Sequence, residues 1–226
     1  MRRLRLLASP LSLLVAGGLW LPIGAAAQSA WYLGASGGQS AIKASAGEVD
    51  QGFLIDDAFT ASGTTLDKKD TAWKLYGGYR FNRFFGAEAG YADLGKASFS
   101  TTIVGAPVGT TPAPPFPIQA TAKARGVFLS ALAHLQLGDS ASVFVKAGAF
   151  RSEAEFTEVI TTTGATRVSR TERRTDANYG IGLQWGFSPS LAARLELERF
   201  RRVGRQIGGR EGRDVDLASL GIVFKF

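Results

Sequence analysis

Apolar and polar residues alternate with a period of two in eight separate segments of the chain. In residues 142–150, Val143, Val145 and Ala147 share one face, whereas Phe144 and Lys146 share the other. Alternation of this kind predicts a strand with two chemically different faces. The same pattern predicts strands over residues 31–38, 71–81, 85–94, 125–137, 142–150, 178–187, 191–200 and 217–226.

Short and long connections alternate between these eight segments. The short ones are Asn82-Arg83, Gly138-Asp139-Ser140 and Ser188-Pro189-Ser190, which have turn-forming residues. The long ones are polar and cover roughly residues 41–70, 95–122, 158–175 and 203–213. An up-and-down order then places the short turns and both termini at one end. Transmembrane barrels have this asymmetry, with short periplasmic turns and long extracellular loops.

A soluble eight-stranded barrel of the lipocalin type is the structural alternative. One face of the predicted strands carries charge, at Lys74, Arg80, Glu88, Lys146, Arg194, Glu196, Glu198 and Lys225. Such a face suits a narrow interior filled by ion pairs better than a lipocalin pocket, which holds its larger apolar residues inside.

Aromatic residues on the apolar face lie near the strand ends, and the chain closes on Phe226. Those near the short turns are Tyr79, Phe81, Phe85, Trp185, Phe187, Phe224 and Phe226, and those near the other end are Trp73, Tyr91 and Tyr179. Two aromatic girdles of this kind mark two membrane interfaces. We therefore predict an all-β fold, an eight-stranded antiparallel up-and-down transmembrane β-barrel.

The first residues have the layout of a secretory signal peptide. Arg2, Arg3 and Arg5 precede an uncharged apolar stretch, and Ala25-Ala26-Ala27 offers a cleavage site before Gln28. We predict a signal peptide over residues 1–27 and one barrel domain over residues 28–226. The chain has no cysteine, so no disulfide holds it together. Export and a barrel together predict the outer membrane of a Gram-negative-type bacterium.

Catalysis has few candidate residues. The chain has one histidine, His134, and Ser130 on the same face is four residues away, about 13 Å along a strand. His134 is better explained as a hydrogen-bonded residue of the interior. The interior carboxylates have cations nearby, which favours ion pairing over acid–base chemistry. No metal-ligand cluster or phosphate loop is present. We expect no enzyme, metal or cofactor.

Arginine is concentrated in and beside the last two long connections. The residues are Arg167, Arg170, Arg173, Arg174, Arg201, Arg202, Arg205, Arg210 and Arg213. Nucleic-acid binding would explain the arginines but neither the barrel nor the export signal. Guanidinium groups match phosphate oxygens in pairs. We therefore predict contact with lipopolysaccharide by a protein that is a monomer, and the alternative is a solvated loop.

The sequence resembles the OmpA-type family of small outer-membrane barrels, which includes opacity-type and porin-family proteins. The resemblance runs through WYLGASGG, LYGGYRFNRFFGAEAGYADLG, RGVFLSALAHLQL, SPSLAARLELERF and SLGIVFKF, and concerns the barrel domain only. It implies that Leu220, Ile222, Phe224 and Phe226 form the signal read by the outer-membrane assembly machinery. It also implies that Glu88, Lys146, Arg194 and Glu196 plug or gate the interior. Leu132 and Gln184 stand where better-known members have a lysine and a glutamate.

Three hypotheses about the function remain. The first is a barrel with a plugged interior that serves envelope integrity or surface contact. The second is a narrow, porin-like channel for ions or small solutes. The third, less favoured, is a lipid-modifying barrel enzyme.

Overall fold

The computed structural model describes residues 30–105, 107, 109, 114–204 and 212–226. The signal peptide predicted over residues 1–27 therefore lies outside the described residues. The elements are β1 (Trp31–Ile42), α1 (Ala46–Asp57), β2 (Thr60–Asp67), β3 (Lys69–Arg80), β4 (Phe85–Gly105), β5 (Phe116–Leu137), β6 (Ala141–Ile160), β7 (Ala165–Gly186), β8 (Leu191–Val203) and β9 (Arg213–Lys225).

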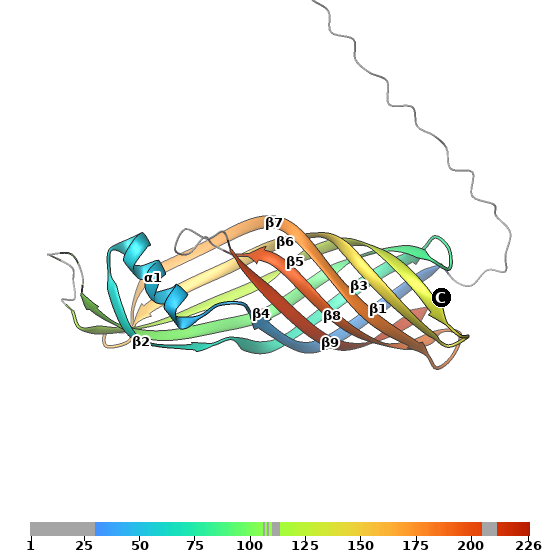
Figure 1. The fold of residues 1–226 in the computed structure, drawn as a ribbon, viewed down its shortest axis with the longest axis horizontal. Coiled ribbons are helices and arrows are strands. Elements are labelled where there is room, and N and C mark those ends of the chain that lie inside the picture. Colours follow the sequence, from blue (N-terminus) through green and yellow to red (C-terminus); the bar gives the residue numbers. More distant parts are fainter. Residues whose placement is uncertain (1–29, 106, 108, 110–113, 205–211) are drawn as a thin grey trace, which may run out of the picture.

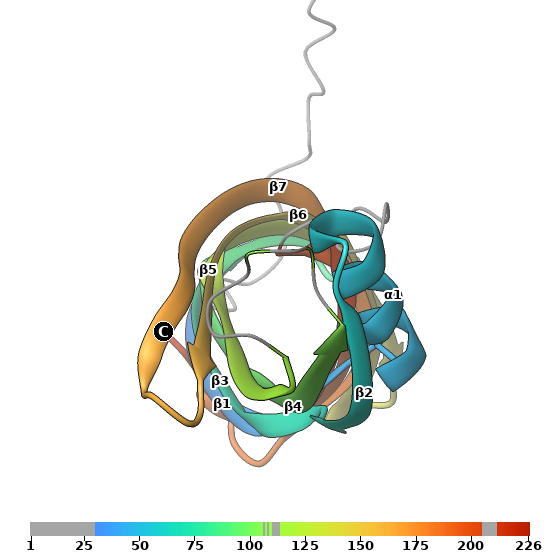
Figure 2. The same cartoon turned by 90° about the vertical axis from the view of Figure 1, so that its left-hand side faces the viewer.

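Eight of the strands form a closed antiparallel ring. Each pairs with its neighbours in the order β4-β3-β1-β9-β8-β7-β6-β5, and pairing of β4 with β5 closes the ring. Strand β2 pairs with β4 beyond the ring. Figure 2 shows the ring end-on, with α1 and β2 at one side of its rim. The predicted all-β, up-and-down antiparallel order is confirmed.

The three predicted short turns lie at one end of the ring, together with both ends of the described chain. Residues 81–84, 138–140 and 187–190 connect β3 to β4, β5 to β6 and β7 to β8. At the same end Trp31 pairs with Tyr79, and Lys225 pairs with Tyr32. Figure 1 shows this end opposite the one that carries α1 and β2. We call it the short-turn end.

The other end differs from the prediction of long loops. Residues 41–70 contain α1 and β2, and residues 95–122 lie largely in β4 and β5. Residues 158–175 form a tight hairpin, because β6 ends at Ile160 and β7 begins at Ala165. The connection predicted over 203–213 lies mostly outside the described residues. Strands β4 to β7 therefore continue well past the ring as a curved extension (Figure 1).

The amino-acid composition of these segments explains why the alternation of apolar and polar residues did not predict them as strands. The extension is rich in threonine, serine and charged residues, so the alternation is interrupted along most of it, although Phe116, Ile118 and Ala120 share one face of β5. Its strands pair continuously nonetheless, from Lys96↔Lys123 to Ile103↔Phe116 and from Arg125↔Glu153 to Ile118↔Ile160. A small apolar cluster supports them, in which Ile103, Phe116, Ile118 and Ile160 pack with Val49 and Phe59.

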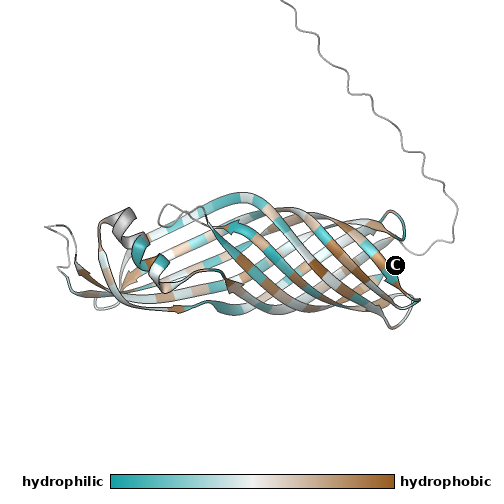
Figure 3. Cartoon of the chain, in the orientation of Figure 1, coloured by the Kyte–Doolittle hydropathy of each residue, from teal (hydrophilic) through white to brown (hydrophobic). Residues whose placement is uncertain are grey.

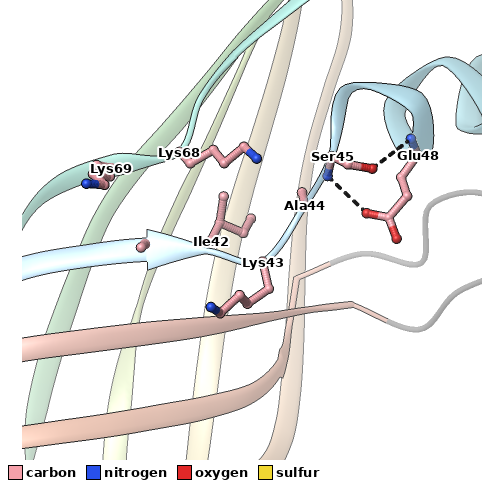
Figure 4. A pocket seen from close by; sticks show the side chains of 8 residues that line it. Ile42, Lys43, Ala44, Ser45, Glu48, Lys68 and Lys69 are labelled. Carbon is pink, nitrogen blue, oxygen red and sulfur yellow. Dashed lines mark hydrogen bonds between the residues drawn. The ribbon is translucent and has the colours of Figure 1, made fainter.

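Helix α1 begins at a capping box and lies in the segment 41–70, which was predicted to be a long polar connection. The Ser45 hydroxyl accepts a hydrogen bond of 3.3 Å from the Glu48 amide, and the Glu48 carboxylate accepts one of 3.0 Å from the Ser45 amide. Figure 4 shows this pair beside a surface hollow lined by Lys43, Lys68 and Lys69. Reciprocal bonds of this type satisfy two free amides at a helix start.

The two faces of the ring have opposite chemistry. Large apolar side chains point outward and remain exposed, such as Leu33 at 57%, Leu129 at 62% and Leu220 at 65%. Polar, aromatic and charged side chains alternate with them and point inward. Figure 3 shows the resulting brown and teal alternation along the strands. Among the described residues no helix is long and apolar enough to cross a membrane.

Candidate functional site

Six charged side chains meet inside the ring and form what we call the central ionic network. They come from four different strands and are almost fully buried, with exposures of 4% or less. Their inward position follows from strand parity, because residues two apart point to the same face. The members are Lys74 on β3, Glu88 on β4, Lys146 on β6, and Arg194, Glu196 and Glu198 on β8.

Two lysines share the two β8 glutamates, each contacting a different oxygen of both carboxylates. The Lys74 ammonium is 2.5 Å from Glu196 Oε2 and also contacts Glu198 Oε2. The Lys146 ammonium is 3.2 Å from Glu196 Oε1 and 2.5 Å from Glu198 Oε1. It also reaches Glu88 Oε1 at 3.4 Å, which connects the glutamates of β8 to β4.

Arg194 closes the network on the other side. Its Nη1 donates a hydrogen bond of 2.5 Å to Glu88 Oε2, and its Nε and Nη2 donate to Gln184 Oε1 at 3.2 and 3.0 Å. Its guanidinium carbon lies 4.8 to 5.3 Å from the ring centroids of Tyr32, Tyr76 and Phe144. Cation–π contacts strengthen when water is removed, so this cage holds a desolvated charge.

The network contains three cations and three carboxylates, so its formal charge is zero. Burying ionised groups is costly unless each one is paired and hydrogen-bonded. Every member has at least one opposite charge within 3.4 Å. An eight-stranded ring is just wide enough for side chains to fill. The network thus bridges β3, β4, β6 and β8 across the interior.

Two predicted members of the ionic set lie elsewhere. Arg80 and Lys225 lie at the short-turn end, where Arg80 Nη2 is 3.0 Å from His134 Nδ1. Neither forms a salt bridge with any residue that the structure describes. Of the eight ionic residues predicted to line the interior, six therefore lie together in the central ionic network, and Arg80 and Lys225 lie apart from it.

Sequence reasoning missed the neutral residues that complete the network. The Tyr32 hydroxyl donates a hydrogen bond of 3.1 Å to Glu88 Oε2. Tyr32 and Tyr76 lie over Gly78 and Gly34, their direct partners on the paired strand. Inward-facing aromatic residues opposite glycines on a neighbouring strand were the signal available in the sequence.

Ser130 and His134, which were considered as a catalytic pair and not favoured, have other hydrogen-bond partners. Ser130 instead pairs with Asn178, whose Nδ2 donates to the serine hydroxyl at 3.0 Å. No group of three or more histidine or acidic side chains that could hold a metal ion occurs among the described residues.

The predicted arginine surface is largely paired with carboxylates. Arg173 contacts Glu153 at 2.7 Å, Arg202 contacts Asp176 at 2.6 Å, and Arg201 contacts Asp214 at 3.4 Å. Arg174 and Arg213 lie within 4.0 Å of Asp176 and Glu48, and Arg170 lies on β7. The side chain of Arg167 and the residues Arg205 and Arg210 lie outside what the structure describes.

Hydrogen bonds from Arg173 and then Arg125 hold the pKa of Glu153 below its usual range.

The terminal aromatic residues lie on β9 or directly after it and point outward. Leu220, Ile222, Phe224 and Phe226 are exposed by 51 to 65%, and Phe226 donates its amide to the Trp31 carbonyl at 3.2 Å. The last strand therefore reaches the start of β1, and its apolar face stays outside the ring.

A closed antiparallel ring with an apolar exterior and an ionic interior defines the class of outer-membrane β-barrel proteins. The chain belongs to the family of OmpA-like transmembrane domains, whose model matches residues 26–226. This membership places the protein in the outer membrane of a Gram-negative bacterium.

Several known proteins are similar to the chain. Outer membrane protein A of Klebsiella pneumoniae is 26% identical over 87% of this chain and 51% of its own length. Outer membrane protein P5 of Haemophilus influenzae is 25% identical over 79% of this chain and 47% of its own. The chain thus spans about half the length of the curated relatives it matches. The structure of Ail, the attachment invasion locus protein of Yersinia pestis, is 18% identical, with a TM-score of 0.49 over 88% of this chain and 99% of Ail.

Proposed function

We propose that this protein is an eight-stranded transmembrane β-barrel whose interior is closed by the central ionic network and which serves envelope integrity or surface contact. The observation that carries the proposal is the charge-balanced group of six buried residues, held by contacts that reach across the ring. A barrel enzyme is not supported, because His134 and Ser130 have other hydrogen-bond partners.

The membrane-spanning part is the half of the molecule with the apolar exterior. Outward residues there are apolar on every ring strand, whereas the extension carries outward charges such as Lys123, Arg125 and Arg151. Trp73 and Tyr91 pack together at the boundary, with ring centroids 5.5 Å apart. Aromatic residues favour the membrane–water interface. In this orientation the short turns face the periplasm and the extension faces outward from the cell.

A channel function would require the network to open. Each cation contacts a carboxylate on another strand, so moving one side chain leaves a buried charge without its partner. Removing one partner of a buried ion pair costs about 3–5 kcal/mol. We therefore expect the closed state to dominate, and the narrow, porin-like channel is the alternative that an electrical measurement distinguishes.

Two kinds of partner complete the proposal. The outer-membrane assembly machinery would bind the aromatic C-terminal strand during insertion. Lipopolysaccharide phosphates would contact arginines at the outer end. Because several arginines there already pair with carboxylates, the surface alternates in sign, and phosphate has to compete with those carboxylates.

The test is a planar-bilayer recording of the refolded protein. We expect long closed periods and a mean conductance far below that of a wide porin. The double variant Lys146→Met/Glu88→Met loses one cation and one carboxylate, so the network stays neutral. It should remain folded and show a higher open probability, because two members of the network are replaced by apolar side chains. Steady conductance by the unmodified barrel would contradict the closed interior and support the channel.

A further inference from the structure

Two cations at the short-turn end of the interior have no carboxylate partner among the residues that the structure describes. Arg80 is the last residue of β3 and Lys225 the last of β9, and both are partly exposed. Across the described chain neither forms an ion pair. They lie on the two strands that flank β1: Tyr32 pairs with Lys225 on one side and with Gly78, two residues before Arg80, on the other. Both side chains therefore point inward near the same end, where like charges repel. This contrasts with the central ionic network, where every charge is matched.

His134 adds a third hydrogen-bond donor to this end. Arg80 Nη2 lies 3.0 Å from His134 Nδ1. A guanidinium only donates, so Nδ1 must accept this hydrogen bond, and the neutral ring then carries its hydrogen on Nε2. Nε2 is buried and has no hydrogen-bond partner in the described part of the chain. Buried donors are nearly always satisfied, so this end has more donors than acceptors.

The negative charges at this end, on Asp139 in a short turn and on the terminal carboxylate of Phe226, form no ion pair with Arg80 or Lys225 among the described residues, and the Lys225 ammonium lies beside a glycine. A side-chain carbon built at Gly186 would meet no atom closer than 3.6 Å, and the Lys225 ammonium would lie 3.8 Å away. The neighbouring strands present uncharged residues to the interior at this end, namely Gly86 on β4, Ser142 on β6 and Ala192 on β8. Glu88, the carboxylate of the adjacent layer, is already bound by Arg194 and Lys146.

We propose that Arg80 and Lys225 form a binding site for a small inorganic anion, phosphate or chloride, at the short-turn end of the barrel. His134 positions the Arg80 guanidinium by accepting its hydrogen bond. The anion would supply the missing acceptors and cancel the repulsion between the two cations. Charge-assisted hydrogen bonds from guanidinium and ammonium groups are the strong class of such bonds. The site does not depend on whether the barrel conducts.

His134 is the only histidine in the sequence, which makes it a specific reporter. The untagged protein would be refolded with ¹⁵N-labelled histidine, and its imidazole signals followed while sodium phosphate replaces sodium gluconate at fixed pH and ionic strength. A parallel titration with sodium chloride separates the two anions. We expect a saturable shift of the His134 signals with at least one of them.

Two variants and a control decide the assignment. Lys225→Gln should weaken anion affinity about tenfold, the value of one charge-assisted hydrogen bond, and Arg80→Gln should abolish the saturable shift. Lys123→Gln, in the extension, should leave it unchanged. A shift that never saturates with either anion, or unchanged affinity in Arg80→Gln, would overturn the proposal. Arg80→Gln carries the test alone if Lys225→Gln fails to assemble, because Lys225 lies between Phe224 and Phe226.

Discussion

Arg194 on β8 donates a hydrogen bond of 2.5 Å to Glu88 on β4, across the interior of the ring. The same carboxylate oxygen also accepts a hydrogen bond from the Tyr32 hydroxyl. Glu88 is thus the point where β1, β4, β6 and β8 are joined, since Lys146 reaches its other oxygen. No sequence-local contact could make this connection.

Replacing Arg194 should loosen this junction. In Arg194→Gln, Glu88 retains Lys146 and Tyr32 but loses its strongest cation, and the network acquires a net negative charge. We expect the free energy of unfolding to fall by about 3 kcal/mol and open events to become more frequent in bilayer recordings. Arg83→Gln, in an exposed short turn, is the control and should change neither. An Arg194→Gln barrel with unaltered stability and conductance would show that the pair does not hold the interior closed.

Two neighbouring glycines on β1 should respond differently to alanine. A side-chain carbon at Gly38 would lie 1.9 Å from the Ala218 carbonyl oxygen, whereas at Gly37 the nearest atom is 4.0 Å away. Gly38→Ala must push β1 away from β9 and should cost about 1–3 kcal/mol. Gly37→Ala faces outward and should be tolerated. Urea titrations of both proteins, followed by heat-modifiable gel mobility, measure the difference, and equal midpoints would argue against close approach at Gly38.

The ring could be predicted from the sequence because a membrane barrel imposes alternation on every spanning strand. Leu129, Ala131 and Ala133 face outward while Ser130, Leu132 and His134 face inward, as their parity requires. The extension could not be predicted in this way. Outside the membrane the outward face no longer has to be apolar, and the inward face can hold polar residues such as Thr101, which is buried, so Ser100 and Thr101 give no alternation although they lie within β4.

The members of the ionic interior were also predictable, but their pairing was not. Parity places Lys74 and Arg80 on the same inward face, and nothing in the sequence separates them. Their positions along the barrel axis separate them. Lys74 contacts Glu196 and Glu198, whereas Arg80 pairs with Gly86 and so lies nearer the short-turn end than Glu88. Which carboxylate a cation reaches depends on the stagger between β3 and β8, which are not sequence neighbours.

The C-terminal residue is expected to control assembly. Phe226 is exposed by 56%, packs near Phe224 at 6.0 Å between ring centroids, and closes the seam through its amide. Deleting Phe226, or replacing it with Asp, should block insertion into the outer membrane, because a charge on the lipid-facing side is unfavourable. Phe226→Tyr is the conservative control. Normal surface yield and normal heat-modifiable mobility of the Asp variant would contradict this role.

Lipopolysaccharide contact can be tested at the outer end of β8. Arg201 and Arg202 have side chains exposed by 46% and pair with Asp214 and Asp176. Replacing Arg201, Arg202 and Arg205 with glutamine should weaken lipopolysaccharide binding and make the remainder less sensitive to salt, because fewer charges are screened. Arg83→Gln, at the opposite end, is the matched control. A folded triple variant with the affinity and salt response of the parent would show that these arginines are ordinary solvated residues.

The extension should lose order in acid. Glu153 on β6 accepts hydrogen bonds from Arg173 on β7 at 2.8 Å and from Arg125 on β5 at 3.2 Å, so it ties three strands together. These contacts lower its pKa. A carboxyl with a lowered pKa stabilises the fold above its unfolded-state pKa, and this contribution disappears as the pH falls through the folded-state value. Hydrogen-exchange protection of β5 to β7 beyond the ring should therefore decrease below about pH 4.

Glu153→Gln should show reduced protection already at neutral pH, whereas Asp139→Asn, in a short turn, should not. Acid-independent protection in the parent protein would mean that the backbone pairing alone holds the extension.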